Sequence, residues 1–306
     1  MSRLTAADWL VPLPGPAVAE LEALVEGLRR DPLPTILLSP PSSGLTGCRE
    51  VMAEVGARLR GPVGLAVLDR VPVERFSEEE NRAVGWVLGS LLGRLVAQKW
   101  DGTMLYDVRD TGKKLEYGVR RSVTNLELQF HTDAPWINLP PEYVGLLCLN
   151  AAAEGGVSRF VSLTDAHSTL QTTAPRLLKR LYQRFPWDRQ AEHAPDDEKV
   201  GWQPVFADGP RCVVCRYNQV LVETGASLAG QAVDAEGREA LDAMRALVES
   251  EARWIELTIA RGQLQYLDNR RFAHARTPFK DGATPETRRH LIRLWNRDEG
   301  RRTFHG

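Results

Sequence analysis

The chain has 306 residues, of which 43% are hydrophobic and 26% are charged, and its formal net charge is −1. This composition is that of a globular protein, and the charge balance gives no electrostatic basis for binding nucleic acid or an anionic membrane. No apolar run reaches the roughly 18 residues that a transmembrane helix needs. The first residues lack a signal-peptide core and the chain has four cysteines, so a cytoplasmic protein is expected.

The first sixty residues are expected to form a helical buttress. Apolar residues recur at helical spacing over residues 16–30, and a second helix is predicted at 47–59. A proline- and serine-rich connection separates them, with a short strand predicted at 35–38. A buried strand follows at 64–68, and the capping-box pattern Ser77-Glu78-Glu79-Glu80 predicts a third helix that ends near residue 93.

From about residue 101 the pattern changes to short alternating segments between turn residues, which is typical of an antiparallel sandwich or barrel. The predicted strands are 103–108, 118–127, 143–149, 158–163, 211–217, 262–267 and 289–295, with helices at about 164–184 and 235–253. The expected architecture is mainly β with flanking helices. We expect one domain, in which residues 61–297 form the core and residues 298–306 a tail.

The functional hypothesis starts from the motif His131-Thr132-Asp133. On an extended strand, residues two apart project from the same face, so an imidazole and a carboxylate can bind one divalent metal from one side. A second histidine would complete the 2-His-1-carboxylate facial triad of non-haem iron oxygenases, which leaves coordination positions open for chemistry. His274 is the candidate, because it lies just past the end of a predicted strand. A motif this short can occur by chance, so the rest of the sequence must support the prediction of a metal site.

Two arginines share one face of the last predicted strand. Arg289 and Arg293 are four residues apart, so both project on the side of Leu291. The segment is either an edge strand with solvated arginines or a buried strand whose guanidinium holds a carboxylate through two parallel hydrogen bonds.

The order of these motifs resembles the TauD/TfdA family of Fe(II)- and 2-oxoglutarate-dependent oxygenases, in its clavaminate synthase-like branch. The resemblance covers about residues 60–297 and rests on His131-Thr132-Asp133, Gly155-Gly156-Val157-Ser158, Asn269 through His274 to Arg276, and Arg289 through Arg293. It implies a double-stranded β-helix, or jelly-roll, core. It also implies an enzyme that uses Fe(II), 2-oxoglutarate and O2 to hydroxylate a small molecule, with release of succinate and CO2. The expected substrate is an amino acid or an amino-acid-derived natural-product intermediate.

The resemblance further implies roles for individual residues. His131, Asp133 and His274 would bind the iron. Arg289 would hold the distal carboxylate of 2-oxoglutarate with the help of Ser158, and Arg293 would lie near the keto-acid end or the substrate. The candidate substrate residues are Arg120, Arg121, Trp136 and Asn138, with Arg120 or Arg121 favoured for a substrate carboxylate.

Several alternatives stay open at this point. The same cofactor chemistry desaturates, cyclises or oxidatively decarboxylates in other settings, whereas halogenation is disfavoured because halogenating relatives replace the carboxylate at position 133. A jelly roll that retains the triad could be a non-catalytic binding or sensor module. A zinc hydrolase is a weaker rival, since it would need neither Arg289 nor the Gly155-Gly156 turn. The polar loop at about 189–201 is either a lid or a mobile surface loop.

Overall fold

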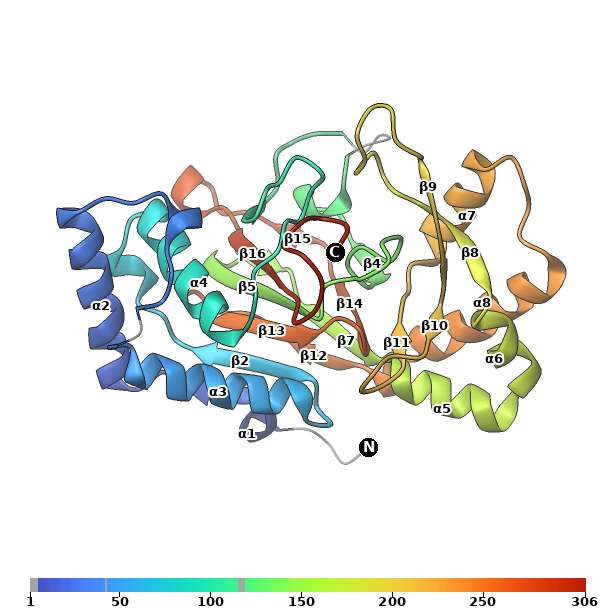
Figure 1. The fold of residues 1–306 in the computed structure, drawn as a ribbon, viewed down its shortest axis with the longest axis horizontal. Helices are drawn as coiled ribbons and strands as arrows, with labels where there is room; N and C mark the ends of the chain where they lie inside the picture. Colours follow the sequence, from blue (N-terminus) through green and yellow to red (C-terminus); the bar gives the residue numbers. More distant parts are fainter. Residues whose placement is uncertain (1–4, 42, 115–118) are drawn as a thin grey trace.

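Two β-sheets facing each other form the centre of the molecule in a computed structural model, which describes residues 5–41, 43–114 and 119–306. The larger sheet has the strand order β1-β2-β13-β5-β16-β3, and the smaller has the order β12-β7-β14-β4 (Figure 1). Side chains from both sheets line one cavity between them. The predicted jelly-roll core with flanking helices is therefore confirmed.

The helices are α1 (Ala6–Trp9), α2 (Gly15–Arg30), α3 (Thr46–Arg60), α4 (Glu78–Leu92), α5 (Leu163–Thr173), α6 (Pro175–Leu181), α7 (Gln219–Leu228) and α8 (Ala235–Val248). The larger sheet contains β1 (Leu10–Pro12), β2 (Leu65–Asp69), β3 (Tyr106–Val108), β5 (Tyr143–Asn150), β13 (Leu264–Asp268) and β16 (His290–Asn296). The smaller contains β4 (Leu128–His131), β7 (Ser158–Ser162), β12 (Ile255–Leu257) and β14 (Phe272–Arg276). The remaining strands pair as β8 (Arg184–Asp188) with β9 (Val200–Pro204), β10 (Phe206–Ala207) with β11 (Val214–Cys215), and β6 (Glu154–Gly155) with β15 (Phe279–Lys280).

Alternation along the central strands of the larger sheet decides which side chains face the helices and which face the smaller sheet. Leu147 on β5, Tyr266 on β13 and Leu294 on β16 are fully buried in one hydrophobic cluster with α2, α3 and α4. Their neighbours Gln265 and Arg293 point to the opposite face and line the cavity between the sheets. The N-terminal helices thus seal one face of the sheet and leave its other face for polar chemistry.

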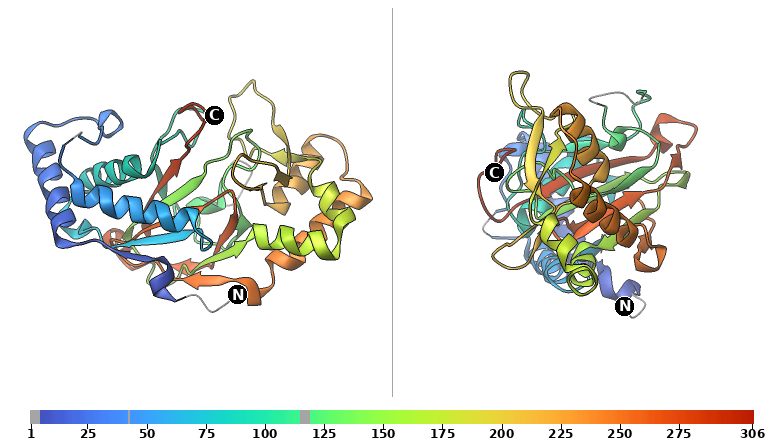
Figure 2. Two further views of the ribbon diagram at one scale, coloured as in Figure 1. Left: turned by 60° about the horizontal axis from the view of Figure 1, so that its bottom comes forward. Right: turned by 90° about the vertical axis from the view of Figure 1, so that its right-hand side faces the viewer.

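The second group of helices lies at the other end of the molecule. Figures 1 and 2 show α5 to α8 on the side of the smaller sheet, away from α2, α3 and α4. Helix α7 packs against β8, and α8 packs against α5 and α6. No helix in the described ranges has the length and apolarity that crossing a bilayer requires.

Most of the predicted elements are present, and four differ. Residues 35–37 form a 3₁₀ turn instead of a strand, and the strand predicted at 211–217 shrinks to β11. The predicted helix at 164–184 is interrupted at Pro175, which cannot donate a backbone hydrogen bond and instead begins α6. The strand predicted at 118–127 begins at a position outside the described residues, and residues 121–123 within it form a 3₁₀ turn.

The packing of β5 against β13 provides a test of the core. Gly145 lies opposite Tyr266, and a Cβ added there would lie 2.4 Å from the fully buried tyrosine ring. We expect Gly145→Ala to lower the free energy of unfolding by about 1–3 kcal/mol, because the core must move to accept the methyl group. Chemical denaturation measures this. Gly27→Ala is the control, because a Cβ at this position in α2 meets nothing within 4 Å; equal stability of the two variants would contradict the packing argument.

Candidate active site

The two histidines predicted to act together lie directly opposite each other on neighbouring strands. His131 on β4 pairs with His274 on β14, and the centroids of their rings are 4.2 Å apart. The expectation that His274 lies just past a strand end was wrong. Strand β13 ends at Asp268, the chain turns over residues 269–271, and β14 then carries His274 at its middle. Antiparallel pairing, which sets opposite side chains close together, therefore brings the two imidazoles side by side.

Asp133 reaches the same point by a bend and not along a strand. Strand β4 ends at His131, and Asp133 lies two residues further on in a bend. The side chain of Asn269 fixes this bend, because its Oδ1 accepts the backbone N–H of Asp133 at 2.7 Å and its Nδ2 donates to the Asp133 carbonyl at 3.2 Å. Oδ1 of Asp133 lies 3.4 Å from Nε2 of His131 and 3.9 Å from Nε2 of His274. One oxygen and two nitrogens, all within 4.8 Å of one another, thus converge on one point.

The protonation of these groups suits metal binding. Burial alone would raise the pKa of Asp133, but Arg293 and the two histidines outweigh it and hold the pKa well below its ordinary value. Burial, His131 and Arg293 lower the pKa of His274 to about 3, so its imidazole is neutral at physiological pH. Nδ1 of His131 lies 2.9 Å from the carbonyl oxygen of Gln129, which can only accept, so Nδ1 carries a proton and Nε2 is the ring nitrogen turned toward Asp133. Two imidazoles and a carboxylate are the donor set of a non-haem iron centre.

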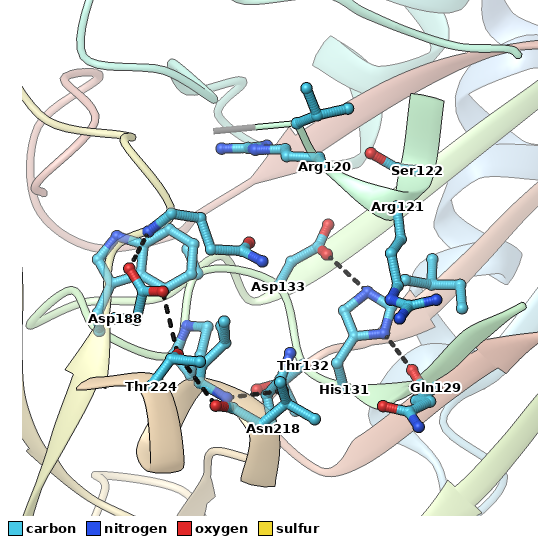
Figure 3. Close-up of a pocket in the computed structure, with 18 of the residues that line it drawn as sticks. Arg120, Arg121, Ser122, Gln129, His131, Thr132, Asp133, Asp188, Asn218 and Thr224 are labelled. Atoms are coloured by element: carbon cyan, nitrogen blue, oxygen red, sulfur yellow. Dashed lines mark hydrogen bonds and ion pairs between the residues drawn. The ribbon is translucent and has the colours of Figure 1, made fainter. Parts of the chain in front are cut away.

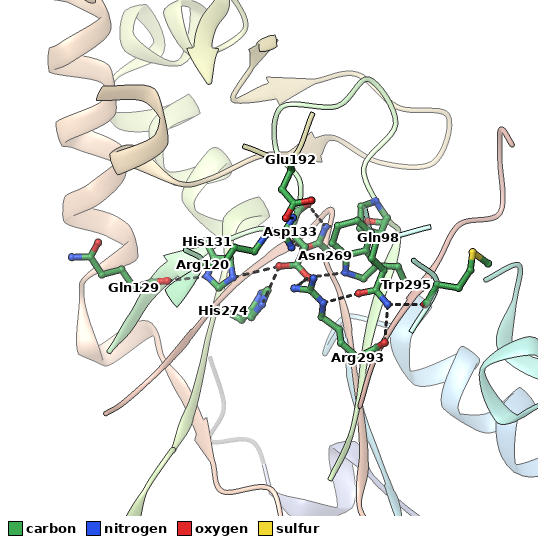
Figure 4. A network of polar contacts seen from close by, with 12 residues as sticks. Gln98, Arg120, Gln129, His131, Asp133, Glu192, Asn269, His274, Arg293 and Trp295 are labelled. Carbon is green, nitrogen blue, oxygen red and sulfur yellow. Dashed lines mark hydrogen bonds and ion pairs between the residues drawn. The ribbon is translucent and has the colours of Figure 1, made fainter. Parts of the chain in front are cut away.

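A buried polar network holds the other carboxylate oxygen of Asp133 (Figure 4). Oδ2 accepts hydrogen bonds from Trp295 Nε1 at 2.7 Å and from Arg293 Nη1 at 3.1 Å. Arg293 is held in turn by Gln98, whose Oε1 accepts from Arg293 Nε at 2.8 Å and whose Nε2 donates to the Arg293 carbonyl at 2.7 Å. The edge-strand interpretation of residues 289–295 was wrong, since β16 lies between β5 and β3.

The cavity between the sheets lies beside this cluster and carries arginines without an acidic partner. Arg289 and Arg276 line it and are at most 5% exposed, and neither forms an ion pair with any residue that the structure describes. Burial lowers the pKa of Arg289 to about 10, and burial together with Arg289 lowers that of Arg276 to about 9, so both are cations at neutral pH. Nη1 of each lacks a hydrogen-bond partner among the residues that the structure describes. Buried cations of this kind call for an anionic ligand.

Ser158 lines the same cavity, as expected, together with two residues that sequence reasoning missed. Gln265 and Ser122 each direct a buried oxygen without a hydrogen-bond partner into this region. A polar residue within the apolar strand Leu264–Asp268 is a signal that could have identified Gln265. Arg276 ends the motif that runs from Asn269 through His274, but the sequence alone assigns it no role in binding. It nevertheless lies on the same face of the strand as His274, because side chains alternate with period two.

A second cavity, of about 300 Å³, opens on the outer side of Asp133 (Figure 3). Arg120, Arg121 and Trp136 line it, as the sequence predicts for substrate residues. Asn138 does not. It is exposed, and its Oδ1 accepts a hydrogen bond from Gln203 Nε2 at 2.7 Å. The structure therefore places Asn138 outside this cavity.

The loop between β8 and β9 is tied to the wall of this cavity. Glu192 in the loop lies 2.6 Å from Nη2 of Arg120, and each side chain is about 10% exposed or less. Arg189 closes the base of the loop through an ion pair with Asp197 at 2.8 Å. Burial lowers the pKa of Arg120, and Glu192 opposes this shift. The loop thus reaches the candidate substrate residues through a buried ion pair.

Known proteins with similar sequences and structures show the family to which the chain belongs. The profile of the family described as "Taurine catabolism dioxygenase TauD, TfdA family" matches residues 50–295. FR-33289 synthase of Streptomyces rubellomurinus is 27% identical over 303 residues, which cover 98% of this chain and 88% of that protein. A taurine hydroxylase-like protein of Stachybotrys chartarum is 25% identical over 304 residues, which cover 95% of this chain and 76% of that protein.

Solved structures with the same fold include an asparagine oxygenase in complex with Fe(II), (2S,3S)-3-hydroxyasparagine and succinate. It has a TM-score of 0.69 and 19% identity, and the match covers 95% of this chain and 94% of that one. The non-haem iron oxygenase OrfP in complex with Fe has a TM-score of 0.70 and 17% identity, with the same coverage. The chain thus belongs to the TauD/TfdA family and is, as its motifs predict, an Fe(II)- and 2-oxoglutarate-dependent dioxygenase.

Proposed function

We propose that the enzyme hydroxylates an amino acid or an amino-acid-derived natural-product intermediate, with release of succinate and CO2. The observation that carries this proposal is the position of the His131, Asp133 and His274 cluster between two cavities. The inner cavity is the one between the two sheets, and its unpaired arginines, Arg276 and Arg289, suit a dicarboxylate. The outer cavity is the one that Arg120, Arg121 and Asp188 line, so it carries charged side chains of both signs. The asparagine oxygenase and OrfP, with its complex with L-homoarginine, support an amino-acid substrate.

The three clustered residues fit Fe(II), and His131, Asp133 and His274 would hold it. Together with 2-oxoglutarate and O2, bound iron supplies the oxidising power for a C–H bond. Three protein donors would leave further coordination positions of the metal for the keto acid and O2. The contribution of the chain is to fix the ligands: Gln129 orients the ring of His131, and Asn269 fixes the bend at Asp133.

Arg289 and Ser158 would bind the distal carboxylate of 2-oxoglutarate in the inner cavity. The unpaired Nη1 atoms of Arg289 and Arg276 support this assignment, because a carboxylate there would satisfy both guanidinium groups. Arg293, which contacts Asp133, lies at the other end of the cavity, beside the metal ligands. The ligand expected from these charges has a carboxylate at each end.

The walls of the outer cavity suit a zwitterion. Arg121 forms no ion pair with the described part of the chain, and its Nη1 makes only a long hydrogen bond of 3.3 Å to the carbonyl of Glu127. On another wall, the buried carboxylate of Asp188 accepts hydrogen bonds from the Thr224 hydroxyl and the Gln190 backbone but has no cationic partner among the described residues. We assign Arg121, with Arg120, to a substrate carboxylate and Asp188 to a substrate ammonium group. Trp136 would pack against the apolar part.

The loop between β8 and β9 would act as a lid. The contact of Glu192 in this loop with Arg120 would close the substrate cavity.

The whole chain would act as one oxygenase domain, because β1 pairs with β2 and Phe304 near the end packs against Trp295. A cytoplasmic location fits the four free cysteines. Desaturation, cyclisation or oxidative decarboxylation of the substrate would use the same residues, and product analysis separates these outcomes.

The metal and cosubstrate can be tested together. We expect anaerobic Fe(II)-loaded protein to develop a weak visible charge-transfer band that saturates as 2-oxoglutarate is added, because the keto acid chelates the iron. The band should be lost in His131→Ala, which removes a ligand. His167→Ala is the control, since His167 contacts Tyr182 and Phe206 and not the cluster. An iron-loaded protein without a band would contradict the oxygenase assignment.

The role of Arg289 can be separated from metal binding. Arg289→Leu should weaken 2-oxoglutarate binding by about 10- to 100-fold, because a hydrogen bond to a charged group contributes about 1.5–3 kcal/mol, while Fe(II) affinity stays within a few-fold. The titration of the same band measures the first and anaerobic metal binding the second. The control is Arg288→Leu, the exposed neighbouring residue. Unchanged affinity for 2-oxoglutarate would place the distal carboxylate elsewhere.

The substrate assignment can be tested with a panel of the proteinogenic L-amino acids and their N-acetyl and methyl ester forms. Succinate formation above background should require both the free ammonium and the free carboxylate. For an active compound, Arg121→Leu should raise KM by about 10-fold or more, because the guanidinium contacts are charge-assisted. The control is the exposed Arg109→Leu. Blocked forms that act as well as the parent compound would remove Arg121 and Asp188 from substrate binding.

A further inference from the structure

The two carboxylate oxygens of Asp133 have different environments. Oδ1 faces the imidazoles at 3.4 Å and 3.9 Å, and no other N–H or O–H group in the described part of the chain donates to it. Oδ2 accepts from Trp295 Nε1 and Arg293 Nη1, and the side chains involved are buried. Since a carboxylate oxygen has about two lone-pair sites, these two donors occupy Oδ2.

We propose that Trp295 is a positioning residue that makes Asp133 a metal ligand through Oδ1 alone. This inference rests on the proposed function, because it requires Asp133 to bind the metal. If Oδ2 were free, the carboxylate could turn and bind through both oxygens, which would occupy a coordination position that the keto acid or O2 needs. The indole N–H is well suited to prevent this, because it can only donate and it carries no charge.

Trp295 and Arg293 differ in the hydrogen bonds that they form besides the one to Asp133. The guanidinium of Arg293 also binds Gln98 and has a free buried nitrogen toward the cavity. Trp295 is 1% exposed and also lines the outer cavity, and within the described residues its Nε1 has one acceptor, Oδ2 of Asp133. The indole N–H of Trp295 therefore serves the carboxylate alone, whereas the guanidinium of Arg293 is shared between the carboxylate and Gln98.

The C-terminal segment holds the ring of Trp295 in place. Phe304 is 3% exposed and stacks on Trp295, with ring centroids 6.4 Å apart and an interplanar angle of 13°. Backbone hydrogen bonds anchor the segment, because the carbonyl of Arg302 accepts the N–H of Ala97 at 2.9 Å. Arg297 is 1% exposed and donates to the carbonyls of both Leu139 and Thr303, which ties the segment to the chain beyond the Asp133 bend. The tail expected at 298–306 thus forms part of the support of the metal site.

The decisive variant is Trp295→Phe, which keeps an aromatic ring for Phe304 and removes the N–H. We expect its Fe(II) affinity, measured anaerobically, to fall by about 10- to 100-fold, as is typical when a hydrogen-bond partner of a metal ligand is lost. The visible band of the 2-oxoglutarate complex should also shift, since the coordination of the carboxylate changes. Trp86→Phe is the matched control: its buried indole donates to the Leu38 carbonyl, and it lies on α4 in the helical cluster. This control should keep the wild-type affinity and band.

The outcomes separate this inference from the proposed function. Wild-type affinity and an unshifted band in a folded Trp295→Phe protein would overturn the role of Trp295 and leave the proposed function intact. Failure of the wild-type protein to bind Fe(II) would overturn both. If Trp295→Phe does not fold, Phe304→Leu carries the test, because it retains the N–H donor and removes its support. A several-fold loss of Fe(II) affinity is expected there, and unchanged affinity would overturn the proposal.

Discussion

The pairing of β4 with β14 is the constraint on which the rest of the site depends. It sets His131 and His274 opposite each other, and it fixes the side of the sheet on which both imidazoles lie. A shift of either strand by one residue would turn one imidazole to the opposite face, because side chains alternate with period two. The neighbouring strand β7 restrains the register further, since it pairs with β14 along its whole length. The sheet thus fixes the positions of the two imidazoles.

The carboxylate of Asp133 is positioned by other contacts, because Asp133 lies beyond the end of β4. The segment after Asp133 is rich in proline and cannot form a β-ladder, so its carbonyl groups need other partners. Arg216, Arg297, Arg270 and Asn269 donate in turn to the carbonyl oxygens of residues 138, 139, 140 and 141. These buried donors replace a strand partner and fix the path of the chain. The bend at Asp133 is therefore held from both sides, by Asn269 at its backbone and by these donors beyond it.

Charge divides the site into an inner and an outer part. In the inner cavity, arginines outnumber acidic groups, and the surplus matches a doubly charged anion bound beside a divalent metal. In the outer cavity, Arg120 already has a partner in Glu192, while Arg121 and Asp188 have none in the described part of the chain. The proposed substrate would therefore meet charged groups of both signs, and one of these groups, Arg120, is already bound to the loop between β8 and β9. Substrate entry and loop position are expected to be coupled through this ion pair.

The sequence by itself determined much of this protein. Helical periodicity and the Ser77 capping box located α2, α3 and α4, and the order of short motifs indicated the family, its cofactors and six of the residues that line the inner cavity. These features are local, because a capping box or an alternating strand is encoded within a few residues. The same local rules failed at Pro175 and at residues 35–37, where a proline or the lack of a partner strand overrides propensity.

Only the tertiary structure decided which residues support the site. Asn269 is 136 residues from Asp133 in sequence, and Trp295 is 162 residues away, yet both hydrogen-bond to it. Glu192 reaches Arg120 in the same way, and Asn138, which is near the motif in sequence, lies outside the cavity. Contacts at such separations leave no periodic pattern in the sequence, because they arise only when distant strands pair and loops cross. The sequence therefore predicted the groups that are proposed to carry the chemistry, and the fold selected the groups that hold them in place.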